Sequence, residues 1–455
     1  MHIAARCSSS SWIVANGQVK AGLHSLLPLL KAGSRVEAVE EMEHLVSVED
    51  HLAVVLRSAL PVAIEKVALE SAHGRILREA LRAAAPIPAF ENSAMDGFAV
   101  RFAEVSEASE DRPAALRVCA DLAAGASDDP PLPPGTAVRI MTGAPMPSEA
   151  DTVVPFEHTV DGLEGSLMRA MITRSPRASG ANVRRVGEDI AAGDEIVASG
   201  TTLRPLHQAA IAASGIGDVH VSRVVRVAVI STGSELVEPG EALGRGRIPE
   251  SNGRMLASLA VEEGCRVVCL TTVPDEGDRL LAVLSDVTTA SSPDRADIVL
   301  FSGGVSAGAF EVVKQALAGR MNFSRIALRP GKPQGFGRTS DGVLLFGLPG
   351  NPVSAAVSFE VFVRPALLQM QGRVAEHRPS LLLPVTRGWR SPAGMRQYVP
   401  VSIDRSDPSG WKASPSGSAG SHGIGALASS GGYAVVPEDV CEVEDGHLVR
   451  ILLTS

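Results

Sequence analysis

The chain has 455 residues, 45% of them hydrophobic, which is enough for about three packed domains. Its 42 basic and 51 acidic residues give a net charge of −9, which argues against nucleic acid or an anionic membrane as the main partner. Aromatic residues make up only 4%, too few for a platform that stacks the bases of single-stranded nucleic acid. Any site for an anion must therefore be local.

The amino-terminal 41 residues show no sustained period and no motif, and we expect them to be a dispensable extension with Met42 as an alternative start. Apolar residues at helical spacing follow at 46–60, where Ser47 suits the N-cap and Asp50 stands three residues later. No apolar run reaches the ~20 residues of a membrane span, and we expect no signal peptide, because a charged region followed by a clear apolar region and cleavage site is missing.

The five cysteines are scattered along the chain, without the paired spacing of a zinc site. Such scattered cysteines indicate small, buried apolar side chains in a protein of a reducing compartment. Together with the missing signal peptide, they predict a cytoplasmic protein.

The stretch 86–101 opens with two prolines and then carries Asp96 and Gly97 ahead of a short apolar β-run. Asp-Gly is a common turn pair, so an ordinary hairpin turn is the simplest interpretation of Asp96.

Residues 111–200 are rich in Val, Gly, Pro and Asp with short β-like runs, which is typical of a small, mostly β module. Two dense polar stretches lie in or beside it, at 139–145 and 180–190. Charges of both signs in the second stretch suit a solvated turn as well as a site. A helical pattern at 201–217 closes this part.

From Arg226 the sequence alternates strands with amphipathic helices, the signature of a parallel α/β sheet. Glu235, Asp275 and Glu311 each come after a predicted strand, so we expect the three carboxylates at one edge of the sheet. They suit a Mg²⁺ ion held partly by substrate oxygens. They also suit three separate acids at helix starts, favoured by the helix macrodipole.

Two glycine-rich turns stand where apolar β-runs end, at 302–308 after strand 297–301 and at 347–354 after strand 342–346. Glycines there let backbone N–H groups approach a ligand. Asn351 suits an N-cap and Pro352 the first helical position, opening an apolar helix. A helix N-terminus beside glycine turns favours a phosphate-bearing ligand at the carboxyl ends of the strands, although tight structural turns without a ligand explain the same residues.

After about residue 371 the chain changes to β-runs punctuated by prolines, at 381–386, 398–403 and 433–436, with a Gly/Ser-rich loop at 414–432. This pattern predicts a small β-barrel or sandwich module.

The motifs at 92–100, 139–145, 187–189, 231–236, 302–308, 330–333 and 347–354 occur in this order, and together the chain resembles the molybdopterin molybdenumtransferase family (MoeA-type, the family of the gephyrin E domain) from about residue 42 onward. The resemblance implies insertion of molybdenum from molybdate into adenylylated molybdopterin, release of AMP, and a Mg²⁺ requirement. It also implies a homodimer whose site is shared between subunits. Candidate further partners are a molybdopterin adenylyltransferase and molybdoenzymes.

The implied fold is multidomain α/β plus β: a parallel α/β sheet domain of the molybdopterin-binding type with a β-rich lid, a helical linker domain and a C-terminal β-barrel-like domain. The expected boundaries are 1–41 for the extension, 42–85 with 181–217 for the linker, 86–180 for the lid, 218–371 for the α/β domain and 372–455 for the last domain.

Carried over position by position, the resemblance assigns functional roles to residues throughout the chain. The implied catalytic residues are Asp96, Thr142, Asp189, Glu235 and Asp275, and the implied Mg²⁺ ligands are Asp275, Glu311 and Glu235. The implied substrate-binding residues are Ser302, Gly303, Gly304, Ser306, Gly308, Arg325, Arg329, Lys332, Pro349, Gly350, Asn351, Ser354 and Ser421.

Four positions depart from the family pattern. Glu311 stands where relatives carry Asp, and Arg325 and Arg329 replace two family lysines. Charge is kept, but a guanidinium is a planar fork rather than a point charge, so the contacts must differ. A further family arginine falls near Pro400, with Arg396 the nearest substitute.

Two other functions share parts of this pattern. A molybdopterin adenylyltransferase has the same α/β domain and similar glycine turns, but it lacks the motifs near residues 92 and 187 and the last β domain. A gephyrin-like scaffold that binds a receptor peptide keeps the fold, yet retention of Asp96, Asp189 and Asp275 argues for an enzyme.

Overall fold

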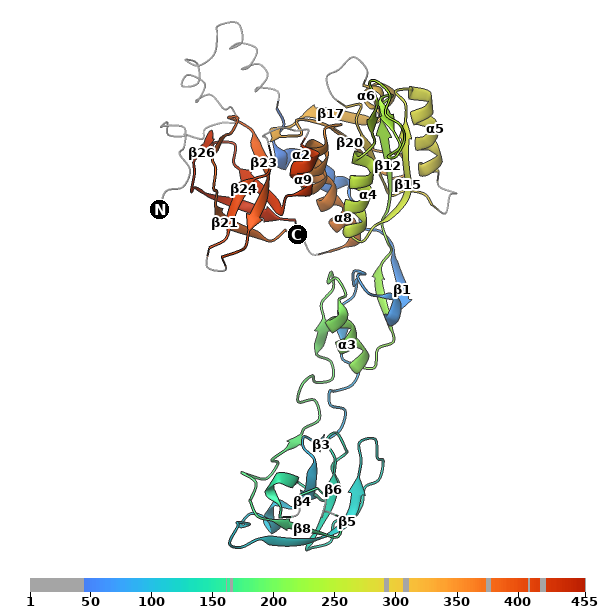
Figure 1. The fold of residues 1–455 in the computed structure, drawn as a ribbon. Helices are drawn as coiled ribbons and strands as arrows, with labels where there is room; N and C mark the ends of the chain where they lie inside the picture. Colours follow the sequence, from blue (N-terminus) through green and yellow to red (C-terminus); the bar gives the residue numbers. More distant parts are fainter. Residues whose placement is uncertain are drawn as a thin grey trace, which may run out of the picture. The chain divides into compact units, whose positions relative to one another are not determined.

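The computed structural model describes residues 45–160, 162–163, 167–289, 294–305, 311–373, 378–407, 410–417 and 423–454. The chain divides into two compact units, one formed by residues 1–65 and 222–455 and the other by residues 66–221 (Figure 1).

The first unit is built on a six-stranded sheet with the order β15-β12-β16-β20-β19-β17. Its strands are β12 (Arg226–Thr232), β15 (Arg266–Val273), β16 (Ile298–Ser302), β17 (Met321–Arg325), β19 (Pro333–Arg338) and β20 (Leu344–Leu348). The helices around it are α2 (Val48–Ser58), α4 (Asn252–Glu262), α5 (Gly277–Thr288) and α6 (Val312–Ala316). A small parallel ladder joins β13 (Leu236–Val237) to β14 (Ile248–Pro249).

The sheet is mixed rather than parallel. Strands β15, β12, β16 and β20 run parallel, as predicted, but β19 pairs antiparallel with both β20 and β17. The prediction of a parallel sheet is therefore wrong at this edge. Only short connections separate β17, β19 and β20, and a short connection returns the chain antiparallel, whereas a parallel neighbour needs a long crossover.

Alternating residues of the central strands feed two hydrophobic cores. On β12, Val227 and Val229 face the core that contains Leu256 of α4, whereas Ala228 and Ile230 face the core that contains Leu280 of α5. Figure 1 accordingly shows α4 and α5 on opposite sides of β12 and β15. This two-sided burial explains why the strands appear in the sequence as continuous apolar runs.

A continuous helix follows the second glycine turn and forms the centre of the larger core. It consists of α7 (Pro352–Ser358), a π-helical stretch η6 (Phe359–Val363) and α8 (Arg364–Gln371), and Gly372 in a left-handed conformation (φ 71°) ends it. The predicted N-cap Asn351 and first-turn Pro352 are confirmed.

Among the described residues, this stretch is also long and apolar enough to cross a membrane, with a mean hydropathy of 1.3, but 89% of it is buried inside the protein. Glu360 and Arg364 interrupt the stretch, so it is not a continuous apolar run, and its burial makes it a core helix.

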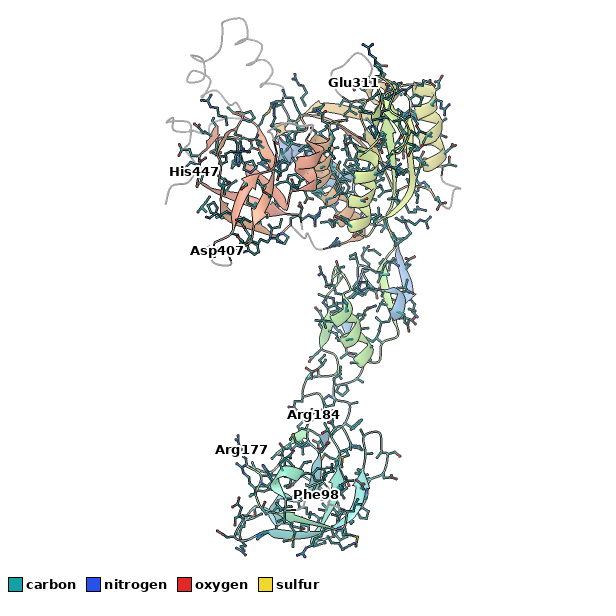
Figure 2. The ribbon with its side chains drawn as sticks, viewed as in Figure 1. Phe98, Arg177, Arg184, Glu311, Asp407 and His447 are labelled. Carbon is teal, nitrogen blue, oxygen red and sulfur yellow. The ribbon has the colours of Figure 1, made fainter. Side chains whose placement is uncertain are left out.

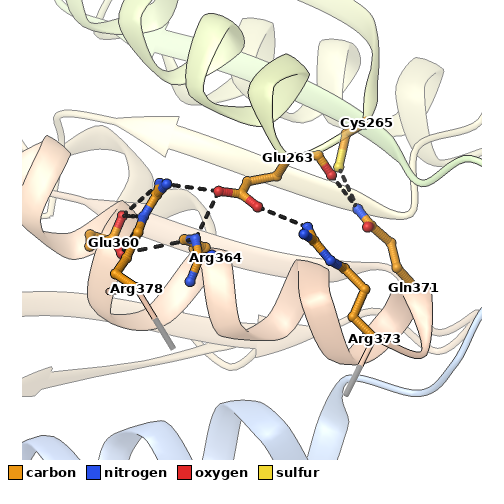
Figure 3. Close-up of polar contacts among 7 residues, drawn as sticks. All are labelled: Glu263, Cys265, Glu360, Arg364, Gln371, Arg373 and Arg378. Carbon is orange, nitrogen blue, oxygen red and sulfur yellow. Dashed lines mark hydrogen bonds and ion pairs between the residues drawn. The ribbon is translucent and has the colours of Figure 1, made fainter. Parts of the chain in front are cut away.

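A cluster of buried charged side chains connects the end of α4 to the helix Pro352–Gln371 (Figure 3). The Glu263 carboxylate lies 2.7 Å from Nε of Arg364 and 3.1 Å from both Arg373 and Arg378. Arg378 also pairs with Glu360 at 3.1 Å, and burial raises the pKa of the Glu360 carboxyl, an effect that Arg378 opposes. The exposed fractions of these five side chains lie between 6% and 18%.

The last part of this unit is a β module whose sheet has the order β18-β23-β25-β27-β21, with β24 added beside β23. Its elements are β18 (Leu328–Arg329), β21 (Ser380–Pro384), β22 (Trp389–Arg390), β23 (Arg396–Asp404), β24 (Lys412–Pro415), α9 (Ile424–Ala428), β25 (Gly432–Val436), β26 (Glu442–Val443) and β27 (Leu448–Leu453). Because β18 leaves the α/β part and pairs with β23, the segment carrying Arg329 is fixed between the two modules.

The second unit contains a five-stranded sheet with the order β7-β4-β6-β5-β8. These strands are β4 (Gly97–Val100), β5 (Ala114–Leu122), β6 (Thr136–Ile140), β7 (Thr152–Pro155) and β8 (Arg169–Ile172). Phe98 lies in its core, edge-on to Phe156 with ring centroids 5.2 Å apart (Figure 2).

Shorter elements complete this part of the chain: β1 (Ile64–Ala68), β2 (Leu81–Arg82), β3 (Asn92–Ser93), β9 (Val183–Arg184), β10 (Glu195–Val197), α3 (Pro205–Ala213) and β11 (Asp218–Ser222), with 3-10 turns η3 (Leu69–Ser71), η4 (Phe102–Glu104) and η5 (Phe156–His158). The predicted helix at 201–217 and the mostly β character of 111–200 are thus confirmed.

Candidate active site

A cavity of about 940 Å³ opens where the strands of the α/β sheet end. Of the residues predicted for the site, it is lined by Glu235, Asp275, Ser302, Gly303, Gly304, Glu311, Arg329, Lys332, Pro349, Gly350, Asn351 and Ser354. Residues from five separate loops thus meet around one space, as expected if the carboxyl ends of neighbouring strands form a ligand site.

The two glycine turns pack directly against each other and against β12. A Cβ atom on Gly303 would lie 2.7 Å from the Thr232 carbonyl oxygen, and a Cβ on Gly350 would lie 3.5 Å from Cα of Gly303. The N–H of Gly303 donates to the Leu348 carbonyl at 3.1 Å. Gly303 is therefore required by the packing of the protein itself, and its N–H is already used.

Two loops carrying carboxylates are tied together at the rim of the cavity. The N–H of Ser234 donates to Oδ2 of Asp275 at 3.0 Å, and the N–H of Asp275 donates to Oγ of Ser234 at 3.1 Å. The side chains of Glu235 and Asp275 are exposed at this rim. Oδ1 of Asp275 is not engaged in this pair of bonds, so the carboxylate can contact a ligand.

Within the part of the chain that the structure describes, no three His, Cys, Asp or Glu side chains cluster closely enough to hold a metal ion by themselves. Asp275, Glu235 and Glu311 nevertheless line one cavity. Such a donor set fits a Mg²⁺ ion that takes most of its oxygens from substrate phosphates and water, which is the usual way Mg²⁺ is bound.

Positive charge lines the same cavity. Burial lowers the pKa of the Lys332 ammonium, and the nearby positive charges of Arg325 and Arg329 lower it further. Arg325, at the end of β17, is not among the lining residues, so its influence is electrostatic. A cluster of three cations gains most from a multiply charged anion, which removes their mutual repulsion.

Asp96 and Thr142 lie in the second unit, where they form a bonded pair. Oδ1 of Asp96 accepts from both the N–H and the Oγ1–H of Thr142, each at 2.7 Å. These two bonds lower the pKa of the Asp96 carboxyl, so an exposed and ionised carboxylate is held in a fixed orientation. Asp189 lies in a nearby stretch of the chain, where its N–H donates to the Ile87 carbonyl at 3.0 Å.

Three of the predicted site residues, Ser306, Gly308 and Ser421, lie outside the described residues. The gap after Val305 also limits what can be said of the first glycine turn to residues 302–305.

Comparison with known proteins decides the family. Models described as "MoeA N-terminal region (domain I and II)", "Probable molybdopterin binding domain" and "MoeA C-terminal region (domain IV)" match residues 46–215, 228–369 and 383–454. Molybdopterin molybdenumtransferase 2 of Mycobacterium tuberculosis is 39% identical over 89% of this chain and 98% of its own length. The chain belongs to the molybdopterin molybdenumtransferase family.

Other members of the molybdopterin molybdenumtransferase family agree with this assignment. The Bacillus subtilis molybdopterin molybdenumtransferase is 32% identical over 86% of this chain and 89% of its own. The crystal structure of the molybdopterin biosynthesis MoeA protein from Pyrococcus horikosii covers 90% of this chain and 99% of that one, with a TM-score of 0.76 and 31% identity. The resemblance and the multidomain MoeA-like fold expected from it are thereby confirmed.

Two residues that line the cavity are not among those predicted from the sequence. Glu250 and Asn252 both line the cavity, with exposed fractions of only 5% and 9%. Nδ2 of Asn252 donates to Oγ of Ser302 at 3.0 Å and to the Gly350 carbonyl at 2.6 Å, linking the two glycine turns. Their position at the start of helix α4 is a signal, since Glu311 and Asn351 also stand at helix starts.

Proposed function

We propose that this protein inserts molybdenum from molybdate into adenylylated molybdopterin and releases AMP. The observation that carries the proposal is the single cavity in which the paired glycine turns, three carboxylates and the cations Arg329 and Lys332 meet. A pterin whose phosphate is linked to AMP needs such a surface, with donors and cations for the diphosphate and carboxylates for a metal ion.

To break the phosphoanhydride, the protein mainly needs to position the reacting groups and to stabilise the negative charge on the phosphate oxygens. We assign Mg²⁺ to Asp275, with Glu235 and Glu311 beside it. When bound, the ion offsets negative charge on phosphate oxygens. Arg329 and Lys332 offset the remaining charge, and no side chain needs to form a covalent intermediate.

The molybdate oxyanion needs its own place beside the nucleotide. A second cavity of about 1110 Å³ shares Arg329 and Pro330 with the first. Arg387 and Arg390 also line it, and none of its described lining residues is acidic. We propose that molybdate, or the similarly shaped tungstate, approaches the dithiolene end of the substrate through this space, because arginines favour tetrahedral oxyanions.

We further propose a homodimer in which the Asp96 and Thr142 pair of one subunit completes the site of its partner. The carboxylate of Asp96 is exposed and ionised, with the charge of Arg139 as a minor influence on its pKa, which suits a role toward a bound ligand. The cysteines at 119, 265, 269 and 441 form no disulfide, which suits the reducing cytoplasm that we propose as the compartment.

The test is direct: purified protein is incubated with adenylylated molybdopterin, molybdate and Mg²⁺, and AMP release is measured. Release that depends on both molybdate and Mg²⁺ supports the proposal. A control with bare molybdopterin and ATP detects the adenylyltransferase reaction instead. If the control consumes ATP and the first mixture releases no AMP, the protein is an adenylyltransferase and the proposed function is wrong.

A further inference from the structure

Glu250 and Asn252 are two polar side chains on the wall of the main cavity that the reaction chemistry does not use. They stand on either side of Ser251, the N-cap of α4, and both are more than nine-tenths buried. Buried polar groups normally have hydrogen-bond partners, so each atom without one needs an explanation.

One of the two oxygens of the Glu250 carboxylate accepts hydrogen bonds from the protein. Its Oε1 atom accepts from Oγ of Ser231 at 2.9 Å and from the N–H of Gly253 at 2.6 Å. These bonds fix the orientation of the carboxylate, and they close the first turn of α4. The hydrogen bonds that the described residues make to this side chain all go to Oε1, so Oε2 remains for a ligand.

The orientation of the Asn252 amide is also fixed. The Gly350 carbonyl, 2.6 Å away, can only accept a hydrogen bond, so the atom facing it must be the NH₂ group. The oxygen therefore points the other way. Oδ1 of Asn252 is buried and has no hydrogen-bond partner in the described part of the chain. An unsatisfied buried acceptor of this kind is destabilising, and a ligand N–H would satisfy it.

We infer that Glu250 and Asn252 recognise the pyrimidine edge of the pterin ring. This inference rests on the proposed function and adds the residues that identify the heterocycle. A 2-amino-4-oxo ring presents two adjacent donors, the ring N3–H and the 2-amino group, and the cavity wall offers two acceptors, Oε2 of Glu250 and Oδ1 of Asn252. A buried carboxylate repels phosphate, so this end of the cavity suits the uncharged ring.

The sharpest variant is Glu250→Gln. Its Oε1 can still accept from Ser231 and Gly253, so the start of α4 is kept, but an NH₂ donor replaces the Oε2 acceptor. The matched ligands are pterin and lumazine, because lumazine carries a carbonyl oxygen where pterin carries the 2-amino group. Glu262→Gln, on the exposed side of the same helix, is the control for loss of charge.

Binding of pterin and of lumazine is measured by equilibrium dialysis, and folding by thermal melting. We expect the wild-type protein and Glu262→Gln to prefer pterin by roughly tenfold or more, and Glu250→Gln to lose that preference with an unchanged melting temperature. Equal affinity of the wild-type protein for the two ligands would overturn the inference without any variant. So would an unchanged preference in Glu250→Gln.

A second ligand pair separates the pterin from the adenine of the same substrate. Adenosine and inosine differ by the 6-amino group, and the inference expects Glu250→Gln to leave their relative affinities unchanged. If that ratio shifts and the pterin ratio does not, the acceptors recognise adenine and the inference is wrong. AMP release from the wild-type protein is a separate readout, so failure of the proposed function and failure of ring recognition are distinguishable.

Discussion

One oxygen of Asp96 accepts two hydrogen bonds from a single residue, Thr142, both at 2.7 Å. The backbone bond is the larger cause of the lowered pKa of Asp96, and the hydroxyl bond is the second. A turn aspartate usually caps its own turn, but this one reaches across 46 residues of sequence to the end of another strand. The arrangement holds a charged oxygen toward solvent rather than closing a hairpin.

The first prediction concerns that charge. Asp96→Asn keeps an oxygen that can accept both bonds from Thr142, so we expect normal folding. Because Asn lacks the negative charge, AMP release should fall by at least roughly tenfold. Turnover is measured alongside the melting temperature. Thr142→Val, which removes only the hydroxyl bond, should lose less activity, and a silent Asp96→Asn would reduce Asp96 to a turn residue.

The proposed sharing of the site between subunits yields a separate prediction. Co-expression of Asp96→Asn chains with Asp275→Asn chains should give heterodimers with one intact site, because each chain supplies the residue that the other lacks. We expect partial recovery of AMP release in heterodimers isolated with two different affinity tags. Heterodimers as inactive as the parent variants would show that each site is built within one chain.

Asp275→Asn should reduce turnover much more than stability. The side chain is exposed, and Asn can still accept from the N–H of Ser234, so we expect the free energy of unfolding to change by no more than about 0.5 kcal/mol. Activity should fall roughly tenfold to a hundredfold, with a raised Mg²⁺ requirement. Asp278→Asn, an exposed acid in the first turn of α5, is the control. A large fall in melting temperature at full specific activity would make Asp275 a structural residue.

Glu263 offers a stability prediction that is independent of function. Its carboxylate is 6% exposed and contacts Arg364, Arg373 and Arg378. Glu263→Gln leaves three buried guanidinium groups with one carboxylate, Glu360, so we expect a loss of about 3–5 kcal/mol in the free energy of unfolding. Chemical denaturation measures it. The neighbouring exposed Glu262→Gln should change it by less than about 0.5 kcal/mol, and equal losses in both variants would contradict the role of the cluster.

His51 should make the protein less stable in acid. Burial lowers its pKa from 6.5 to about 4, and its ring packs edge-on to Phe362 with centroids 4.7 Å apart. Between pH 6.5 and 4 the unfolded chain binds a proton that the folded chain does not. The stability present above pH 6.5 is therefore lost as pH falls, by up to about 1.4 kcal/mol per pH unit.

Denaturation midpoints of wild type and His51→Phe, compared from pH 7 to pH 5, measure this effect. Phe cannot titrate, so its stability should fall less steeply with pH, whatever its absolute value. Parallel curves for the two proteins would mean that folding does not shift the pKa of His51.

The sequence was most informative where function depends on local features. Glycines, a proline after Asn351 and acids just after apolar runs are visible without knowledge of the fold, and most of them line one cavity. The reason for Gly303 was not visible, because its neighbour Thr232 lies some 70 residues earlier in the chain. The burial of Glu250 and Asn252 was equally hidden, since a polar residue at the start of a helix normally faces solvent.

The antiparallel edge of the sheet and the cluster around Glu263 show the same limit. Strand direction at β19 follows from connection lengths, which a pattern of apolar runs does not encode. Glu263 ends α4 and Arg364 lies within the long helix, and charged side chains at such positions are usually solvated. Only the packing of α4 against α8 turns them into a buried ion pair.

The long apolar helix has a consequence for how the chain is made. Before the chain has folded, the stretch Pro352–Gln371 is not yet buried, and its length and hydropathy are those of a helix that could cross a membrane. Every strand of the sheet that covers it, from β12 to β20, is earlier in the sequence and has already been synthesised. The segment can therefore pack on strands that precede it in the chain, whereas Tyr398 and Tyr433 of the last β module complete the same core only later.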